Sequence, residues 1–219
     1  MMGNMKPSRF DSETKGWIKV SAVGFLASYA ITTSLGFAFP SQIGGLAQAF
    51  IDFLGGARGG IWMNEQIFWH VLVWNMLVVC ITLVMGFLAL SFTYPISFGF
   101  FVGLTAGTWS YRHGVSFNPW TLIMVPWGIH GWIEAAYMIF ASGITMKIGI
   151  EAFGIKNRKD LMKHVFSTPR PIPSWKQLIK PILKNVFINY LCLVIPAVVF
   201  GAFFEAYVTD LIFRIFYPT

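Results

Sequence analysis

Long apolar runs separated by short polar stretches make up most of this chain. A helix that crosses a bilayer needs about 20 mainly apolar residues. Four runs reach that length: residues 17–39, 67–91, 127–150 and 186–208. A fifth run, residues 96–111, is shorter and rich in glycine, and it follows the helix-breaking pair Tyr94-Pro95. The pattern predicts an all-α, polytopic membrane bundle of about five transmembrane helices.

The segments between these runs have their own character. Residues 40–66 form an extracytoplasmic or interfacial segment, whose Gly-rich part, 40–60, is mildly amphipathic and is expected to lie on the membrane or dip into it. Residues 119–125 lead into the span at 127–150, and the sequence leaves open whether they re-enter the membrane. We treat the chain, residues 1–219, as a single integral membrane domain.

Charge supports this interpretation and gives an orientation. Only 11% of the residues are charged, against about 25% in soluble domains. The net charge of +7 is local, because lysine and arginine concentrate in the N-terminal region, with its tail at 1–16, and in the basic connection 151–185. The positive-inside rule then predicts that the N-terminus is cytoplasmic. We expect the protein to lie in the cytoplasmic (plasma) membrane. We expect no nucleic acid partner. The basic connection 151–185 is suited to binding anionic lipid or a cytoplasmic protein.

Glu134 and Glu205 lie inside predicted spans, where a carboxylate normally faces protein or water and has a partner. Counting about 1.5 Å per residue, the predicted topology puts several polar residues at a similar depth in the outer half of the membrane. This polar cluster consists of His70, Asn75, His130, Glu134 and Glu205. His130 and Glu134 are four residues apart and therefore share a helix face. Thr105 and Thr108 fall near the same level.

Four hypotheses for the polar cluster remain open. The first is structural: the cluster locks helices together. The second is a substrate or ion site in a transporter or channel component. The third is the active site of an intramembrane metal-dependent hydrolase, and the fourth is a haem site between His70 and His130. His130 with Glu134 lacks one histidine of an H-E-x-x-H arrangement, so a metal would need further ligands such as His70 or Glu205. Cys80 and Cys192 lie in apolar runs, where we expect small core residues rather than a disulfide or metal site. We expect no metal and no cofactor.

Small residues repeat in the short, Gly-rich run at residues 96–111. Gly99, Gly103 and Gly107 recur at every fourth position, which lets two helices approach closely. Tight packing within the chain is the expected use of this stripe, with a homo-oligomer contact as the alternative.

Several of these motifs together resemble the stage II sporulation protein M family. HGWIE (130–134) is similar to a His-Gly-x-x-Glu motif that opens a late transmembrane helix in that family, although Ile129 stands where the family usually has proline. AFFEAYVT (202–209) resembles the Ala-x-x-Glu-Ala pattern of its last span, and Asn75 with FGFFVGLTAG (98–107) resembles its Asn-containing helix and the Gly-rich segment that follows. The resemblance covers about residues 67–210.

The resemblance implies a multi-pass membrane subunit that scaffolds or anchors a protein complex. Under this expectation the partners are membrane lipids and other membrane proteins, with a homo-oligomer as a further option. The residues that the resemblance points to are Asn75, His130, Glu134 and Glu205.

Overall fold

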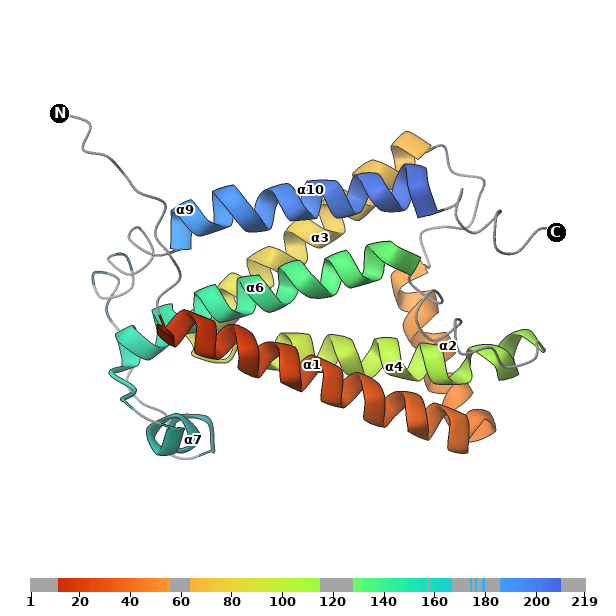
Figure 1. The fold of residues 1–219 in the computed structure, drawn as a ribbon, viewed down its shortest axis with the longest axis horizontal. Coiled ribbons are helices and arrows are strands. Elements are labelled where there is room, and N and C mark those ends of the chain that lie inside the picture. The colour runs from red at the N-terminus through yellow and green to blue at the C-terminus, as the bar shows by residue number, and fades with distance from the viewer. Residues whose placement is uncertain are drawn as a thin grey trace.

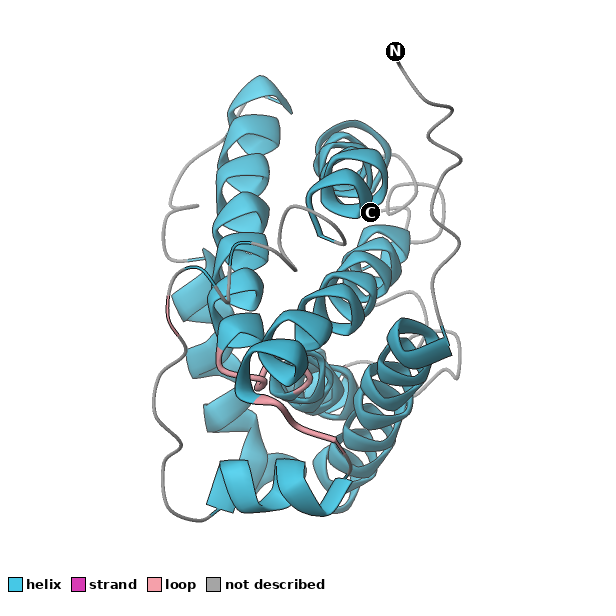
Figure 2. Ribbon diagram, turned by 90° about the vertical axis from the view of Figure 1, so that its left-hand side faces the viewer, coloured by secondary structure: helices cyan, strands magenta, loops and turns pink. Residues whose placement is uncertain are grey.

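The computed structural model describes residues 12–55, 64–114, 128–156, 158–166, 174, 176, 179 and 186–209. Every regular element in this part of the chain is a helix (Figure 2). The long helices are α1 (Ser12–Ala38), α2 (Pro40–Gly55), α3 (Asn64–Phe87), α4 (Thr93–His113) and α6 (Gly128–Phe153). The remaining elements are α7 (Arg158–Phe166), α9 (Phe187–Asn189), η2 (Tyr190–Val194), α10 (Ile195–Phe204) and η3 (Glu205–Thr209), of which η2 and η3 are π-helical turns.

Five helical segments run across the molecule, with α1, α4 and α10 pointing one way and α3 and α6 the other (Figure 1). Four segments of the described chain are long and apolar enough to cross a membrane: Ser12–Ala38, Glu65–Phe87, Gly131–Phe153 and Phe187–Val208. The fifth, α4, is more polar but has 21 residues and packs along α1. The predicted class, an all-α bundle of an integral multi-pass membrane protein, is confirmed.

Helix α6 is the centre of the bundle. It packs against α1, α3, α4 and α10, and 72% of its apolar stretch is buried, against 28%, 22% and 28% for the other three candidate spans. Its buried face includes Tyr137, Met138, Ala141, Ile144 and Ile148. The other helices divide into two groups, α1 with α2 and α4 on one side and α3 with α10 on the other, and both groups rest on α6.

The glycine stripe of α4 lies against α1. A Cβ atom on Gly99 would come within 2.5 Å of the Phe25 carbonyl oxygen and the Ser28 hydroxyl, and one on Gly103 or Gly107 would overlap α1 in the same way. The Ser28 hydroxyl uses this closeness to donate a hydrogen bond of 2.8 Å to the Ile96 carbonyl. The stripe therefore serves contact within the chain.

A tight turn joins α3 to α4. Ala89 is fully buried there with a positive φ of 55°, a backbone conformation that costs energy in any residue but glycine. Helix α4 then begins at Thr93, so Pro95 lies in its first turn, where the missing N–H of proline has no intrahelical partner to lose. The sequence predicted a break at Tyr94-Pro95, whereas in the structure this pair starts the helix and α3 ends earlier, at Phe87.

The predicted interfacial segment contains a regular helix, α2, that packs against the C-terminal half of α4. Phe50 stacks on Phe101 with ring centroids 4.4 Å apart. The Arg112 guanidinium donates hydrogen bonds to the Gln48 side-chain oxygen at 3.1 Å and to the Thr108 hydroxyl at 3.2 Å. These contacts fasten α2 across the end of α4.

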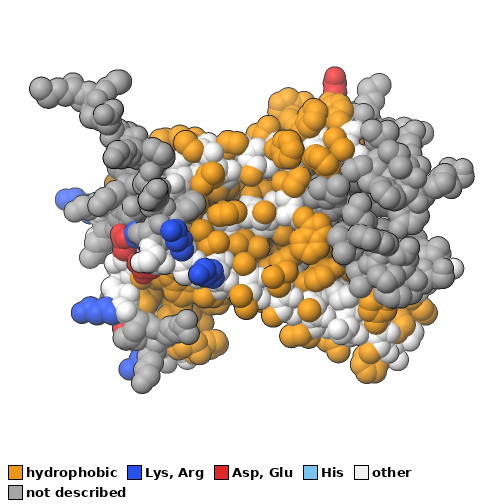
Figure 3. Space-filling view, viewed as in Figure 1, with side chains coloured by type: hydrophobic (Ala, Val, Ile, Leu, Met, Phe, Trp, Pro, Cys, Tyr) orange, Lys and Arg blue, Asp and Glu red, His pale blue; other side chains and the backbone are white. Residues whose placement is uncertain are grey.

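Apolar side chains cover the middle of the surface, whereas lysine and arginine gather at the end where α1 begins (Figure 3). Helix α7 lies at this same end (Figure 1) and is held there by buried Leu161 and by a hydrogen bond of 2.9 Å between His164 Nε2 and the Leu88 carbonyl. The start of α1, with Lys15 and Lys19, and the beginning of the 151–185 connection thus lie at one end of the bundle.

Candidate functional site

A cavity of about 320 Å³ lies among α3, α4 and α6, with Phe50 of α2 and Glu205 of η3 in its wall. It exists because α3 and α4 each pack on α6 but hardly touch each other. Four residues of the predicted polar cluster line it: His70, Asn75, Glu134 and Glu205. The helices that supply them, α3, α6 and the C-terminal segment, are far apart in the sequence, so the fold brings these residues together.

Glu134 and Asn75 form the polar floor of the cavity. The Asn75 side-chain amide donates a hydrogen bond of 2.7 Å to Glu134 Oε1. Both side chains are buried, with 5% of Glu134 and 6% of Asn75 exposed. A hydrogen bond between two side chains this deeply buried stabilises the contact between α3 and α6.

His70 and Glu205 also line the cavity. His70 is on α3, before Asn75, and its ring lies edge-on to Trp74 with centroids 6.3 Å apart. Glu205 is the first residue of the π-helical turn η3. Such turns widen a helix locally and occur frequently at functional sites.

Two tyrosines lie at or near this site that the sequence did not single out as site residues. Tyr94, at the start of α4, lines the cavity. Tyr137, one turn after Glu134, does not line it; this side chain is 1% exposed, and its hydroxyl has no hydrogen-bond partner among the described residues. A tyrosine in an apolar run is an ordinary packing residue, and only its position three residues from Glu134 marks it.

The other predicted residues either lie outside the described residues or do not line the cavity. The side chain of His130, in the first turn of α6, lies outside the described residues, as does the lead-in 119–125. Thr105 and Thr108 do not line the cavity; their hydroxyls donate to the Val102 and Leu104 carbonyls of their own helix, both at 2.8 Å.

The described part of the chain contains no group of three His, Cys, Asp or Glu side chains placed to hold a metal ion. Cys80 and Cys192 are free, and both are exposed on the outside of the bundle. The expectation that they are core residues is therefore wrong: each lies on the lipid-facing side of its apolar helix, which hydrophobicity alone does not distinguish from the buried side.

Comparison with known proteins places this site within a family. The family model for stage II sporulation protein M matches residues 19–210, from the first transmembrane helix to the end of η3. Comparisons with curated proteins and with solved structures give no match. The matched region includes all the residues that line the cavity. The chain therefore belongs to the stage II sporulation protein M family.

Proposed function

We propose that this protein is a scaffold subunit of a complex in the cytoplasmic membrane, and that it binds a transmembrane helix of a partner protein along α10. The family relationship supports a multi-pass membrane protein, and the distribution of side chains on α10 supports the scaffold role. The observation that carries the proposal is an aromatic stripe on the outer face of this helix.

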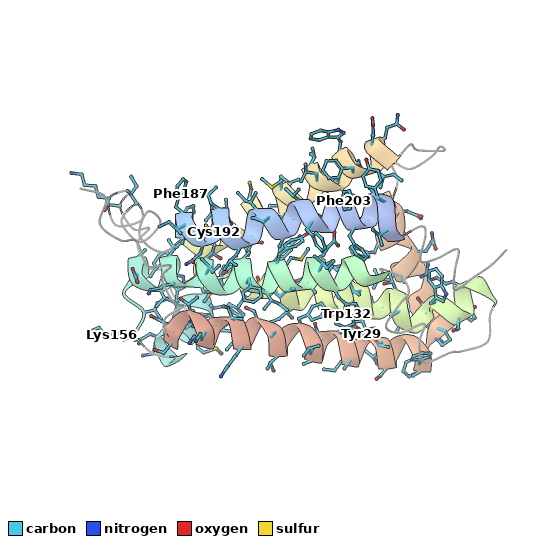
Figure 4. All side chains as sticks on the ribbon, turned by 45° about the horizontal axis from the view of Figure 1, so that its top comes forward. Tyr29, Trp132, Lys156, Phe187, Cys192 and Phe203 are labelled. Carbon is cyan, nitrogen blue, oxygen red and sulfur yellow. The ribbon has the colours of Figure 1, made fainter. Side chains whose placement is uncertain are left out.

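Helix α10, together with the adjoining turns η2 and η3, has two distinct faces. Val194, Val198, Ala202 and Ala206 recur at every fourth position, and all four are buried against the bundle. The outward face instead carries Phe200, Phe203 and Tyr207, all exposed; Figure 4 labels Phe203 on this segment. The side chains of the buried face are small and let helices approach closely, whereas those of the outward face are large and aromatic.

The aromatic stripe has the composition of an interface. The rings of Phe203 and Tyr207 are 4.9 Å apart, so neighbouring turns present one continuous aromatic surface. Aromatic residues are enriched in protein–protein interfaces, and they supply large contact areas with few rotatable bonds. Between transmembrane helices, van der Waals packing is a main source of affinity, because lipid tails are as apolar as the helices themselves.

A photo-crosslinking experiment tests this proposal. Benzoylphenylalanine is incorporated at Phe203, which is 48% exposed, and as a matched control at Val23 of α1, which is 66% exposed but has no aromatic stripe around it. Membranes are irradiated before solubilisation, and adducts are identified by mass spectrometry.

We expect a single protein adduct of reproducible mass from Phe203 and only lipid adducts from Val23. Lipid adducts alone at both positions would show that α10 faces the bilayer, and the scaffold proposal would then be wrong. An adduct with a second copy of the chain would identify the complex as a homo-oligomer.

A further inference from the structure

We propose that the cavity among α3, α4 and α6 binds an organic cation whose positive charge is carried on an apolar body. This site is separate from the aromatic stripe of α10, so the proposal goes beyond the scaffold role and does not depend on it. Three features of the cavity lead to this class of ligand: its shape, its charge and its aromatic wall.

The cavity is of the size and form that admit a small molecule from the bilayer. Its volume of about 320 Å³ is at the lower end of the range of about 300–1,000 Å³ for small-molecule sites. Leu77 and Ile81 of α3 and Ser97 of α4 line it and are also exposed, so the gap between these two helices opens sideways. In a membrane protein this direction faces the lipid chains, and an apolar ligand can enter from there.

The wall of the cavity is acidic. Glu134 and Glu205 both line it, and described lysine and arginine side chains are absent from it. The charge favours a cation and disfavours an anion.

The rest of the wall is aromatic. The same cavity is also lined by five aromatic side chains from α3, α4 and α2, namely Trp74, Tyr94, Phe98, Phe101 and Phe50. Aromatic faces attract cations through their quadrupoles, and tryptophan does so most strongly. Cages of aromatic rings recognise ammonium groups in this way, whereas a small hydrated metal ion would gain little from an apolar wall. Carboxylates combined with aromatic rings therefore favour a bulky monovalent cation.

The test uses tetraphenylphosphonium, a cation with an apolar body, and tetraphenylborate, an anion of nearly the same size and shape. The purified full-length protein is placed in nanodiscs of neutral lipid, and binding of each labelled ion is measured by equilibrium dialysis against empty nanodiscs. We expect saturable binding of tetraphenylphosphonium, one ion per chain, and no saturable binding of tetraphenylborate. Absence of saturable cation binding, or equal binding of both ions, would overturn the proposal.

Three variants locate the site. Glu134→Gln should weaken tetraphenylphosphonium binding at least tenfold, because the charge is lost while a hydrogen bond to Asn75 is still possible. Trp74→Leu should weaken it about fivefold through loss of a cation–π contact. Glu151→Gln, the matched control, removes a half-exposed carboxylate at the other end of α6, where it pairs with Lys147, and should leave binding unchanged.

Unchanged binding in both cavity variants would place the cation elsewhere and contradict the proposal. If Glu134→Gln does not fold, as judged by circular dichroism and gel filtration, Trp74→Leu decides alone, because Trp74 is partly exposed at the cavity wall and its replacement leaves the polar floor intact. Cross-linking from Phe203 is measured separately, so a failure of the scaffold role and a failure of cation binding give different results.

Discussion

At the scale of single residues, the hydrogen bond between Asn75 and Glu134 is the central interaction. It joins α3 to α6 across 59 positions of sequence, between two side chains that are almost completely buried. A buried polar group without a partner costs far more than a satisfied one gains. The pair therefore acts mainly on the specificity of helix packing. It holds α3 in one register on α6, and in this way it fixes the wall of the cavity.

A double-mutant cycle measures this interaction. Asn75→Ala and Glu134→Ala should each lower the stability of the protein in detergent, by about 1–3 kcal/mol, because each leaves the other side chain buried without its partner. The double variant should be less destabilised than the sum, with a coupling energy of about 1 kcal/mol, as in other membrane proteins. Unfolding is followed by far-UV circular dichroism during denaturant titration. Strictly additive losses would mean that the hydrogen bond does not hold the two helices together.

How far the site could be predicted from sequence differs from residue to residue. Glu134, Glu205, Asn75 and His70 stand out because each is polar within an apolar run, and counting residues along the predicted spans put them at one depth. Their arrangement around a cavity was not predictable, since it depends on the separation of α3 from α4. The burial of the Tyr137 hydroxyl without a hydrogen-bond partner among the described residues was also not predictable, since a tyrosine in an apolar run is an ordinary packing residue.

At the scale of elements, the contact between α1 and α4 is the most extensive between described helices. Gly103 faces the Thr32 hydroxyl and the Tyr29 carbonyl, with no room for a Cβ atom. Thr32 and Thr33 are buried on the opposing face of α1. Backbone-to-backbone approach compensates for the modest hydrophobicity of α4, because such packing does not depend on long apolar side chains.

Replacing the central glycine tests this contact. Gly103→Ala should destabilise the protein by about 1–3 kcal/mol, since the new methyl group forces α1 and α4 apart. Gly16→Ala is the matched control: Gly16 lies in α1, where an added methyl group would meet no other atom within 4 Å, and there alanine should stabilise the helix by up to about 1 kcal/mol. Both are measured as shifts in thermal unfolding midpoint. A neutral effect of Gly103→Ala would show that the α1–α4 contact is loose.

The extent of each helix was only partly readable from the sequence. Hydrophobic runs located α1, α3, α6 and the C-terminal segment closely, since a membrane span imposes its own length. The start of α4 was misjudged because proline breaks a helix in its interior but is favourable in its first turn, and sequence alone does not say where that turn falls. Helix α2 was ambiguous for a different reason: its weak amphipathic pattern forms a regular helix once Phe50 and Gln48 contact α4.

At the scale of the whole molecule, the bundle has two chemically different ends. The end that carries the start of α1 and α7 is basic, whereas α2 lies at the other end (Figures 1 and 3). Exposed lysines at the basic end include Lys15, Lys19 and Lys163. Since cytoplasmic segments carry the excess of lysine and arginine in membrane proteins, we predict that α7 is cytoplasmic and α2 is outside.

Cysteine accessibility tests this orientation. Cys80 and Cys192 are first replaced by alanine, which removes the two exposed thiols found on the described helices. Single cysteines are then introduced as Ser41→Cys in α2 and Lys163→Cys in α7, two exposed positions at opposite ends of the bundle. A membrane-impermeant maleimide should label Ser41→Cys in intact cells, and Lys163→Cys only after the membrane is permeabilised. The reverse pattern would place the basic end outside. The cavity, whose polar floor lies in the half of α6 nearer α2, would then belong to the cytoplasmic leaflet, and cations would reach it from that side.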